Sequence, residues 1–327
     1  MGDRMVRRAL LTLAPLAVLA LAPEAATAAQ ASTAAPDARI SLHIVGSWSV
    51  ARRPLAVAGR ALRAEGRIAP YVAGETVELR VWRGHTLVQR IRAHLKPTAT
   101  QRTATFNVRF VPARSGFTQI FAVHARTARQ GAASARAALS VVAPDAGPGS
   151  RGPFVALLQQ RLAAVGYATP QTGVYDQLTG LAVLAFRKVN GMARVTTLSP
   201  RVVDRVLRGV GGFRVRYPGQ GHHVEANLGW QVLALIDHGR VVRAYTTSSG
   251  KPSTPTVLGT FHFYMREPGT NSHGMVDSTY FIRGYAIHGY YDVPTYNASH
   301  GCLRVPIPDA FAIYSWIHLG DPIDVYY

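Results

Sequence analysis

The period of the hydrophobic pattern changes twice along this chain, and that change limits the folds open to it. From about residue 39 to residue 142, apolar and polar residues alternate over short runs such as Thr76–Trp82 and Phe106–Phe110. Alternation with period two is typical of half-buried β-strands. Gly and Pro separate the runs, which favours an antiparallel β-sandwich of the immunoglobulin-like kind over residues 38–143. This segment holds no catalytic constellation, so we interpret it as a spacer module.

Between residues 150 and 210 the apolar residues follow a helical period instead. Those that share the first helix face are Val155, Leu158, Leu162 and Val165. Gly166 predicts the end of that helix, and Asp176 and Ser199-Pro200 predict the N-caps of two more. Three short helices within about 60 residues indicate a small three-helix bundle.

Strand patterns return over residues 213–327. Trp230–Ile236 and Val241–Tyr245 flank Asp237-His238-Gly239-Arg240, which predicts a β-hairpin with a glycine-containing turn. The polar, glycine-containing stretch Met265–Tyr280 is expected to form a loop that closes over a cleft. The sequence therefore predicts a multidomain chain whose last segment is mostly β.

The N-terminus has the composition of an export signal over residues 1–28. Three arginines precede the apolar run Leu10–Leu21, and Ala26-Thr27-Ala28 offers the small residues of a cleavage site. The run contains Pro15 and is shorter than the roughly 20 residues that span a bilayer. We expect export to the cell envelope or the medium and no transmembrane span after signal removal. An uncleaved signal anchor is the alternative.

The chain is strongly basic, with 36 Lys+Arg against 17 Asp+Glu and a formal net charge of +19. Its only lysines are Lys96, Lys188 and Lys251, so the charge is nearly all arginine, spread without runs of like charge. Two interpretations stay open: the codon usage of the host genome, and attraction to an anionic cell envelope. Nucleic-acid binding needs a recognisable module or basic face, and export argues against it, so we expect no nucleic-acid partner.

The sole cysteine, Cys302, stands in the run Ser299–Cys302. In an exported chain it has no intramolecular disulfide partner, which points to a reactive thiol. A nucleophilic thiolate needs a base and an accessible position. On an extended segment His300 shares a face with Cys302, while His288 ends an earlier apolar strand.

Neighbouring groups suit acyl chemistry as well. The amide of Gly301 or Cys302 is placed to line an oxyanion site, and Arg304 offers a planar fork for a carboxylate. The residues by themselves leave two interpretations open, nucleophilic catalysis and a buried structural cysteine.

The helical segment resembles the peptidoglycan-binding domain found on many wall enzymes. The matching positions are Val155, Leu158-Gln159, Leu162, Gly166-Tyr167, Gly173–Asp176, Thr179, Ala182-Val183 and Phe186. The segment departs from that family at Arg187-Lys188, where a glutamine is commoner. The resemblance implies that residues 150–210 bind peptidoglycan glycan, and we expect them to do so as a separate unit.

Residues 213–327 resemble the L,D-transpeptidases of peptidoglycan, in which a His-Gly is followed by Ser-His-Gly-Cys and an Arg or Asn. The matching positions are Ser249-Gly250, Thr254–Phe261, Gly284–Gly289, Ser299–Cys302, Arg304 and Gly320–Tyr326. The resemblance implies a mostly β catalytic domain in which Cys302 is the nucleophile and His288 its base. It also implies that His300, Gly301 and the Cys302 backbone shape the oxyanion site, that Ser299 belongs to the oxyanion and substrate-binding group, and that Arg304 steadies the substrate. We expect no metal or other cofactor.

The implied reaction is formation of a 3→3 cross-link between peptidoglycan stem peptides through a thioester, with release of terminal D-Ala. An L,D-carboxypeptidase using the same site and a non-catalytic wall-binding protein are the alternatives. A zinc peptidase is the rival enzyme, because this region also holds His262, His273, His288 and His300. It has no H-E-x-x-H motif and no recognised zinc spacing, so we do not favour it.

Overall fold

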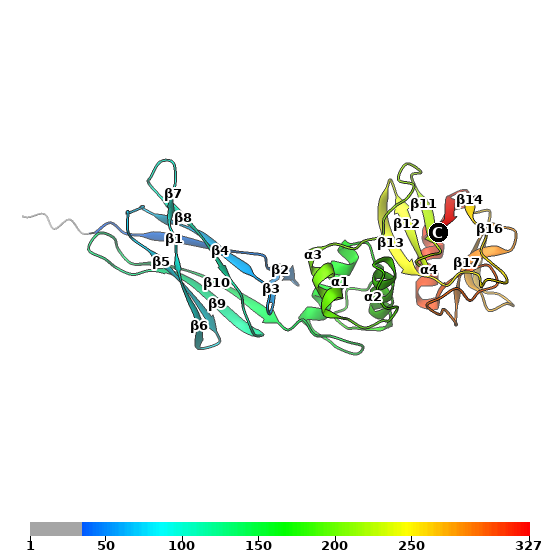
Figure 1. The fold of residues 1–327 in the computed structure, drawn as a ribbon, viewed down its shortest axis with the longest axis horizontal. Coiled ribbons are helices and arrows are strands. Elements are labelled where there is room, and N and C mark those ends of the chain that lie inside the picture. Colours follow the sequence, from blue (N-terminus) through cyan, green and yellow to red (C-terminus); the bar gives the residue numbers. More distant parts are fainter. Residues whose placement is uncertain (1–34) are drawn as a thin grey trace, which may run out of the picture. The chain divides into compact units, whose positions relative to one another are not determined.

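The computed structural model describes residues 35–327, of which Pro36–Tyr327 form one compact unit. Its elements run in the order strands, helices, strands (Figure 1). The strands of the first segment are β1 (Arg39–Val45), β2 (Trp48–Val50), β3 (Arg53–Val57), β4 (Leu62–Ala69), β5 (Val77–Arg83), β6 (Thr86–Ala93), β7 (Lys96–Pro97), β8 (Ala104–Phe110), β9 (Gly116–His124) and β10 (Ala133–Val142).

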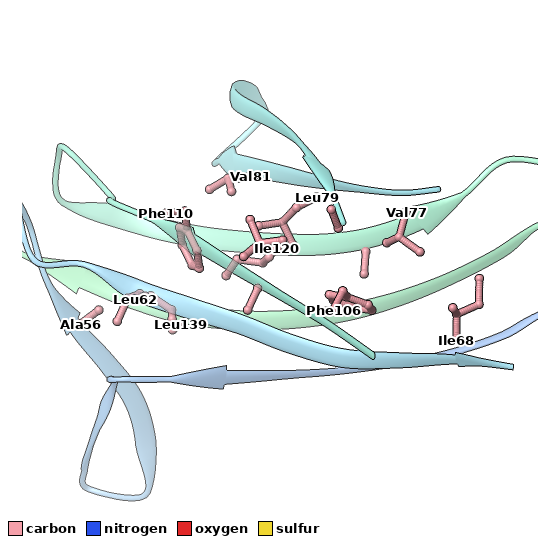
Figure 2. Packing of buried hydrophobic residues seen from close by; sticks show 14 of the residues in the cluster. Ala56, Leu62, Ile68, Val77, Leu79, Val81, Phe106, Phe110, Ile120 and Leu139 are labelled. Atoms are coloured by element: carbon pink, nitrogen blue, oxygen red, sulfur yellow. The ribbon is translucent and has the colours of Figure 1, made fainter. Parts of the chain in front are cut away.

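These strands form two sheets around a shared core. One has the order β1-β4-β8-β7 and the other β2-β3-β10-β9-β5-β6. Alternate residues of β5 and β8 are buried, as the period-two pattern predicted. Figure 2 shows Phe106 and Phe110 of β8 and Leu79 and Ile120 of β5 and β9 among the packed residues. Burial of these apolar side chains stabilises the two-layer arrangement.

Three helices follow: α1 (Pro153–Ala164), α2 (Gln177–Val189) and α3 (Pro200–Arg208). Asp176 accepts a hydrogen bond from the Thr179 amide at 2.8 Å and caps α2. Ser199 accepts from the Val202 amide at 3.4 Å and caps α3. Both caps lie where the sequence predicted them, because these side chains satisfy amides that have no partner within the helix.

The core formed by the helices continues into the C-terminal segment. Val232, Ala234, Ile236 and Ala244 of the following strands belong to the same buried cluster as the α1 and α2 side chains. The backbone joins as well, because the Ala244 amide donates to Gly166 at 2.7 Å. An isolated 150–210 segment would expose this apolar surface to water. The expectation that it binds glycan as a separate unit stays a prediction.

The C-terminal segment contains two further sheets and one helix. One sheet has the order β13-β12-β11-β19-β14 and the other β15-β16-β17-β18. The elements are β11 (His223–Asn227), β12 (Val232–Asp237), β13 (Arg240–Thr246), β14 (Gly259–His262), β15 (Met265–Thr270), β16 (Val276–Ile282), β17 (Tyr285–Tyr290), β18 (Leu303–Pro306), α4 (Ile307–Trp316) and β19 (Pro322–Tyr326). Residues of both sheets and of α4 share one core cluster.

The predicted hairpin is confirmed as β12 and β13, which pair antiparallel. Its turn residues His238 and Gly239 both have positive φ, of 46° and 76°, which suits the twist of the flanking strands. The stretch Met265–Tyr280 was wrongly expected to be a loop: it forms the antiparallel pair β15 and β16. The polar composition misled the interpretation because β15 is exposed or half-buried, and because β16 buries the polar residues Ser278 and Thr279 beside Tyr280 and Phe281.

Within residues 35–327, no helix is both long enough and apolar enough to cross a bilayer. The signal peptide expected over residues 1–28 lies outside the described residues.

Candidate active site

Two neighbouring parallel strands carry the predicted catalytic residues. His288 of β17 is the register partner of Arg304 of β18, and Cys302 immediately precedes β18. Side chains two residues apart on a strand share a face, so Cys302 and Arg304 lie beside His288 and Tyr290. These four residues line a cleft of about 320 Å³. The cleft residues as a whole are His273, Met275, His288, Tyr290, Ser299, His300, Cys302 and Arg304.

His288 is buried, with 3% of its surface exposed. Its Nδ1 lies 2.9 Å from the Gly289 carbonyl oxygen, which fixes the proton on Nδ1 and leaves Nε2 as the acceptor. Its ring also meets Tyr290 edge to face at 5.6 Å between centroids. Burial lowers the pKa of His288 below its usual value and the Arg304 charge adds to this, while the Gly289 hydrogen bond opposes both. The imidazole is therefore held neutral and oriented, as a general base requires.

Cys302 is half-buried, and its Sγ donates to the Gly284 carbonyl at 3.6 Å. Burial raises the pKa of this thiol, although a backbone hydrogen bond at Ala286 and the charge of Arg304 act in the opposite direction. The free site therefore pairs a thiol with a neutral imidazole rather than a thiolate with an imidazolium.

The turn before Cys302 is held by the Ser299 hydroxyl. Ser299 Oγ donates to the Cys302 carbonyl at 2.6 Å and accepts from the Gly301 amide at 3.0 Å. The Gly301 amide, expected as an oxyanion donor, is thus occupied within the turn. Gly301 has φ of 124°, and a Cβ there would stand 2.3 Å from Cε1 of Tyr285. Only glycine fits this position.

Arg304 is held in a defined orientation at the floor of the cleft. Its guanidinium carbon lies 4.2 Å from the Tyr290 ring centroid, a cation–π contact. Its Nη1 donates to the Asp292 carbonyl at 3.4 Å and lies 3.7 Å from the carboxylate of the same residue. The side chain is only 12% exposed, so its remaining donors are available to an anion inside the cleft.

The rim of the cleft carries the more exposed residues. His300 is exposed, and its Nε2 accepts from the Lys251 ammonium at 3.1 Å. His273 and Met275 enter from the turn between β15 and β16. The structure thus brings Cys302, His288, Ser299, His300 and Arg304 into one cleft, whereas Gly301 is buried beneath it.

Sequence reasoning missed the scaffold behind the cleft. Ser248 exchanges two backbone hydrogen bonds of 3.0 Å with Arg304, and the Ser249 carbonyl accepts from the amides of Ala298 and Ser299. The Ser249 backbone amide donates to Gln231 Oε1, and the Ser249 hydroxyl accepts a hydrogen bond from Gln231 Nε2. The segment after β13 therefore positions both ends of the catalytic turn.

Behind that scaffold lies Lys188 of α2, 3% exposed. Its Nζ donates to Thr246 Oγ1 at 2.5 Å and to the carbonyls of Gln231 and Thr247 at 3.0 Å. Burial lowers the pKa of Lys188 to about 7. Lys188, which departs from the peptidoglycan-binding pattern, thus binds the β12–β13 region that supports the cleft. No local sequence signal indicates this long-range contact.

Of the four histidines that suggested a zinc peptidase, His273, His288 and His300 line the cleft, but their nitrogens are not grouped closely enough to hold one ion. In the described part of the chain, the one group of three potential metal ligands within 4.8 Å of one another is His222, His318 and Asp321, none of which lines the cleft.

Two family models match the chain. The L,D-transpeptidase catalytic domain (YkuD) matches residues 221–325, and the putative peptidoglycan binding domain matches residues 151–196. A solved L,D-transpeptidase structure from Xylanimonas cellulosilytica is 33% identical, with a TM-score of 0.50. The match covers 55% of this chain and 97% of that one. The chain belongs to the L,D-transpeptidase family. The family model for the catalytic domain spans the residues of the cleft.

A curated relative, L,D-transpeptidase 1 of Mycobacterium tuberculosis, is 28% identical over 126 residues. That alignment covers 31% of this chain and 48% of the relative, so the chain spans about half the length of the curated relatives it matches.

Proposed function

We propose that this protein is a peptidoglycan L,D-transpeptidase that forms 3→3 cross-links through a Cys302 thioester. The observation that carries the proposal is the convergence of Cys302, a neutral oriented His288 and Arg304 on adjacent strands of one cleft. Membership of the family supplies the substrate class, the stem peptides of peptidoglycan.

In the first step, Cys302 Sγ attacks the carbonyl carbon of the third residue of a tetrapeptide stem. The thiol proton passes to Nε2 of His288, and the carbonyl oxygen takes the negative charge. The tetrahedral intermediate then collapses: the bond to the terminal D-Ala nitrogen breaks, His288 returns the proton to that amine, and D-Ala leaves. The product is a thioester on Cys302.

In the second step, the side-chain amine of a neighbouring stem attacks the thioester carbonyl. His288 removes a proton from the attacking nitrogen and delivers it to the departing Cys302 sulfur, which restores the thiol. An amide bond joins the two stems. Because His288 begins each step neutral, one residue serves as base and then as acid in both.

The oxyanion site is assigned to the Cys302 amide together with the exposed His300, with Ser299 and Gly301 shaping the turn. The Gly301 amide is not assigned, because Ser299 Oγ already accepts from it. Arg304 is assigned to the substrate carboxylate, which a planar guanidinium binds through paired hydrogen bonds. No cofactor enters this scheme.

The remaining segments are proposed to hold the catalytic domain against peptidoglycan. Residues 38–143 are proposed as an immunoglobulin-like spacer, 150–210 as a three-helix domain that binds glycan, and 213–327 as the catalytic domain. Support comes from the two-sheet core, the three helices and the 151–196 family match. An export signal over residues 1–28 would place the chain in the envelope, where its substrate is.

Hydrolysis of the thioester by water would make the same site an L,D-carboxypeptidase. Incubation with tetrapeptide-stem muropeptides separates the two, since product masses distinguish cross-linked dimers from tripeptide stems. The proposal expects dimers one D-Ala lighter than two donors, absent in Cys302→Ala. Tripeptide products alone would assign the carboxypeptidase, and no conversion by the folded protein would assign a non-catalytic wall-binding role.

A further inference from the structure

A cluster of three potential metal ligands lies at one end of the C-terminal segment: His222, His318 and Asp321. None of the three lines the cleft. His222 directly precedes β11, and the other two lie in the turn between α4 and β19. Because β11 and β19 are parallel neighbours, the cluster stands where both strands begin. The catalytic scheme makes no use of it.

The distances in the cluster match those between ligands of one metal ion. Asp321 Oδ2 lies 3.0 Å from His222 Nδ1 and 3.4 Å from His318 Nδ1. Zinc binds histidine nitrogen and carboxylate oxygen at about 2.0–2.2 Å, so tetrahedral ligands around it stand about 3.3 Å apart. The three side chains therefore need little movement to surround an ion.

One ligand atom is unsatisfied as it stands. His222 Nδ1 is buried and makes no hydrogen bond among residues 35–327, although Asp321 Oδ2 is only 3.0 Å away. The oxygen lies off the direction in which a ring N–H donates. A buried nitrogen left in this way costs free energy unless something else binds it.

Two of the ligands are held in place. The His222 ring stacks on Trp316 with centroids 3.7 Å apart and planes 19° from parallel. The Asp321 carboxylate accepts the His318 amide at 2.7 Å, and its carbonyl accepts the Phe263 amide at 3.0 Å. Such outer contacts orient metal ligands. His318 is the exposed member, with 68% of its side chain accessible to solvent.

We propose that His222, His318 and Asp321 form a binding site for a divalent transition-metal ion of the zinc class. Two imidazoles and one carboxylate suit Zn²⁺, Ni²⁺ or Cu²⁺, whereas Mg²⁺ and Ca²⁺ prefer oxygen ligands alone. The ion would tie the α4–β19 turn to the start of β11, which is a structural role. Three protein ligands leave a fourth position for water.

The test is calorimetric titration of the untagged protein with Zn²⁺ in a Cys302→Ser background, which removes the thiol as a competing ligand. The pH is kept above the usual histidine value of about 6.5, so that the imidazoles are free to bind. One equivalent is expected to bind and to raise the melting temperature. His318→Ala, at an exposed position, is expected to weaken binding at least tenfold, and His222→Gln likewise.

His238→Ala is the matched control, because His238 is an exposed turn histidine paired with Asp237 at 2.8 Å. It is expected to leave binding unchanged. Titration with Co²⁺ adds a readout of geometry, since a tetrahedral site gives visible absorption bands. No saturable Zn²⁺ binding, or binding that survives either His318→Ala or His222→Gln in the folded protein, would overturn the proposal, and equal weakening in His238→Ala would show nonspecific surface binding.

Discussion

His288 and Arg304 stand opposite each other in register on two parallel strands, β17 and β18. The guanidinium is fixed over Tyr290, and its charge, together with burial, disfavours a proton on His288. Cys302, the proposed nucleophile, stands one position before β18 and lines the same cleft. Strand register, rather than closeness in sequence, therefore brings Cys302, His288 and Arg304 together.

The first prediction concerns the acid limb of the pH–rate profile. Because the pKa of His288 is lowered from 6.5, the base stays neutral at more acid pH than an ordinary histidine. We expect kcat/KM for cross-linking to fall with a midpoint below pH 6.5 as His288 becomes protonated. Arg304→Gln removes a nearby positive charge and should move that midpoint upward. A midpoint above 6.5 in the parent protein would contradict the neutral-base assignment.

Gly301→Ala tests the shape of the catalytic turn. The new Cβ would overlap the Tyr285 ring, and φ of 124° is strained for alanine. We expect a loss of about 1–3 kcal/mol in the free energy of unfolding and a fall in acylation rate of at least about tenfold. Gly219→Ala is the control, since nothing lies within 4 Å of its added Cβ. Equal acylation rates in the two variants would show that the turn tolerates a side chain.

Lys188→Met tests the buried amine behind the site. The substitution leaves three acceptors without their donor, and we expect it to cost about 3 kcal/mol in unfolding free energy. The pKa of Lys188 is about 7 in the folded protein, against the ordinary value of 10.5 expected in the unfolded chain. Between pH 7 and pH 10.5 the unfolded chain therefore binds more protons than the folded protein. Stability of the parent should therefore rise with pH across that window, and the variant should lose this contribution.

Lys96→Met is the matched control for that series, because Lys96 is exposed on β7. Denaturant unfolding from pH 7 to pH 10 supplies the measurement. Lys96→Met should show the same rise of unfolding free energy with pH as the parent protein. If Lys188→Met shows that rise as well, the Lys188 amine is not the group that titrates.

The β15–β16 pair is expected to order when the site is acylated. His273 and Met275 at its turn line the cleft, while Glu267 accepts from Asn271 at 2.9 Å and from Tyr280 at 2.7 Å within the pair. A covered thioester favours an incoming amine over water. Amide exchange over residues 271–276 should slow after acylation of Cys302, with exchange in β5 unchanged as the internal control. Identical rates before and after acylation would show a fixed wall.

The sequence predicted the local features well because these depend on local chemistry. The caps at Asp176 and Ser199, the turn at Gly239 and the period-two strands each follow from a few neighbouring residues. The cleft residues followed from the Ser299–Cys302 run and its family resemblance. The fold of Met265–Tyr280 was missed because an antiparallel pair with one exposed strand and buried polar residues has the composition of a polar loop.

Long-range contacts escaped prediction for a different reason. Lys188 reaches Gln231 and Thr247, 43 and 59 residues away, and no periodicity encodes such pairing. His222 and Asp321 meet because β11 and β19 are neighbours, a fact of topology rather than of spacing. The occupied Gly301 amide likewise depended on the rotamer of Ser299.

Intact mass spectrometry of the protein after exposure to a carbapenem tests the central assignment most directly. Such a β-lactam acylates the nucleophile and stays attached. The account predicts one adduct on the parent protein, located by peptide mapping to Cys302, and none on a folded Cys302→Ala variant. An adduct of the same mass on Cys302→Ala, or an adduct mapped to another residue of the parent, would contradict it.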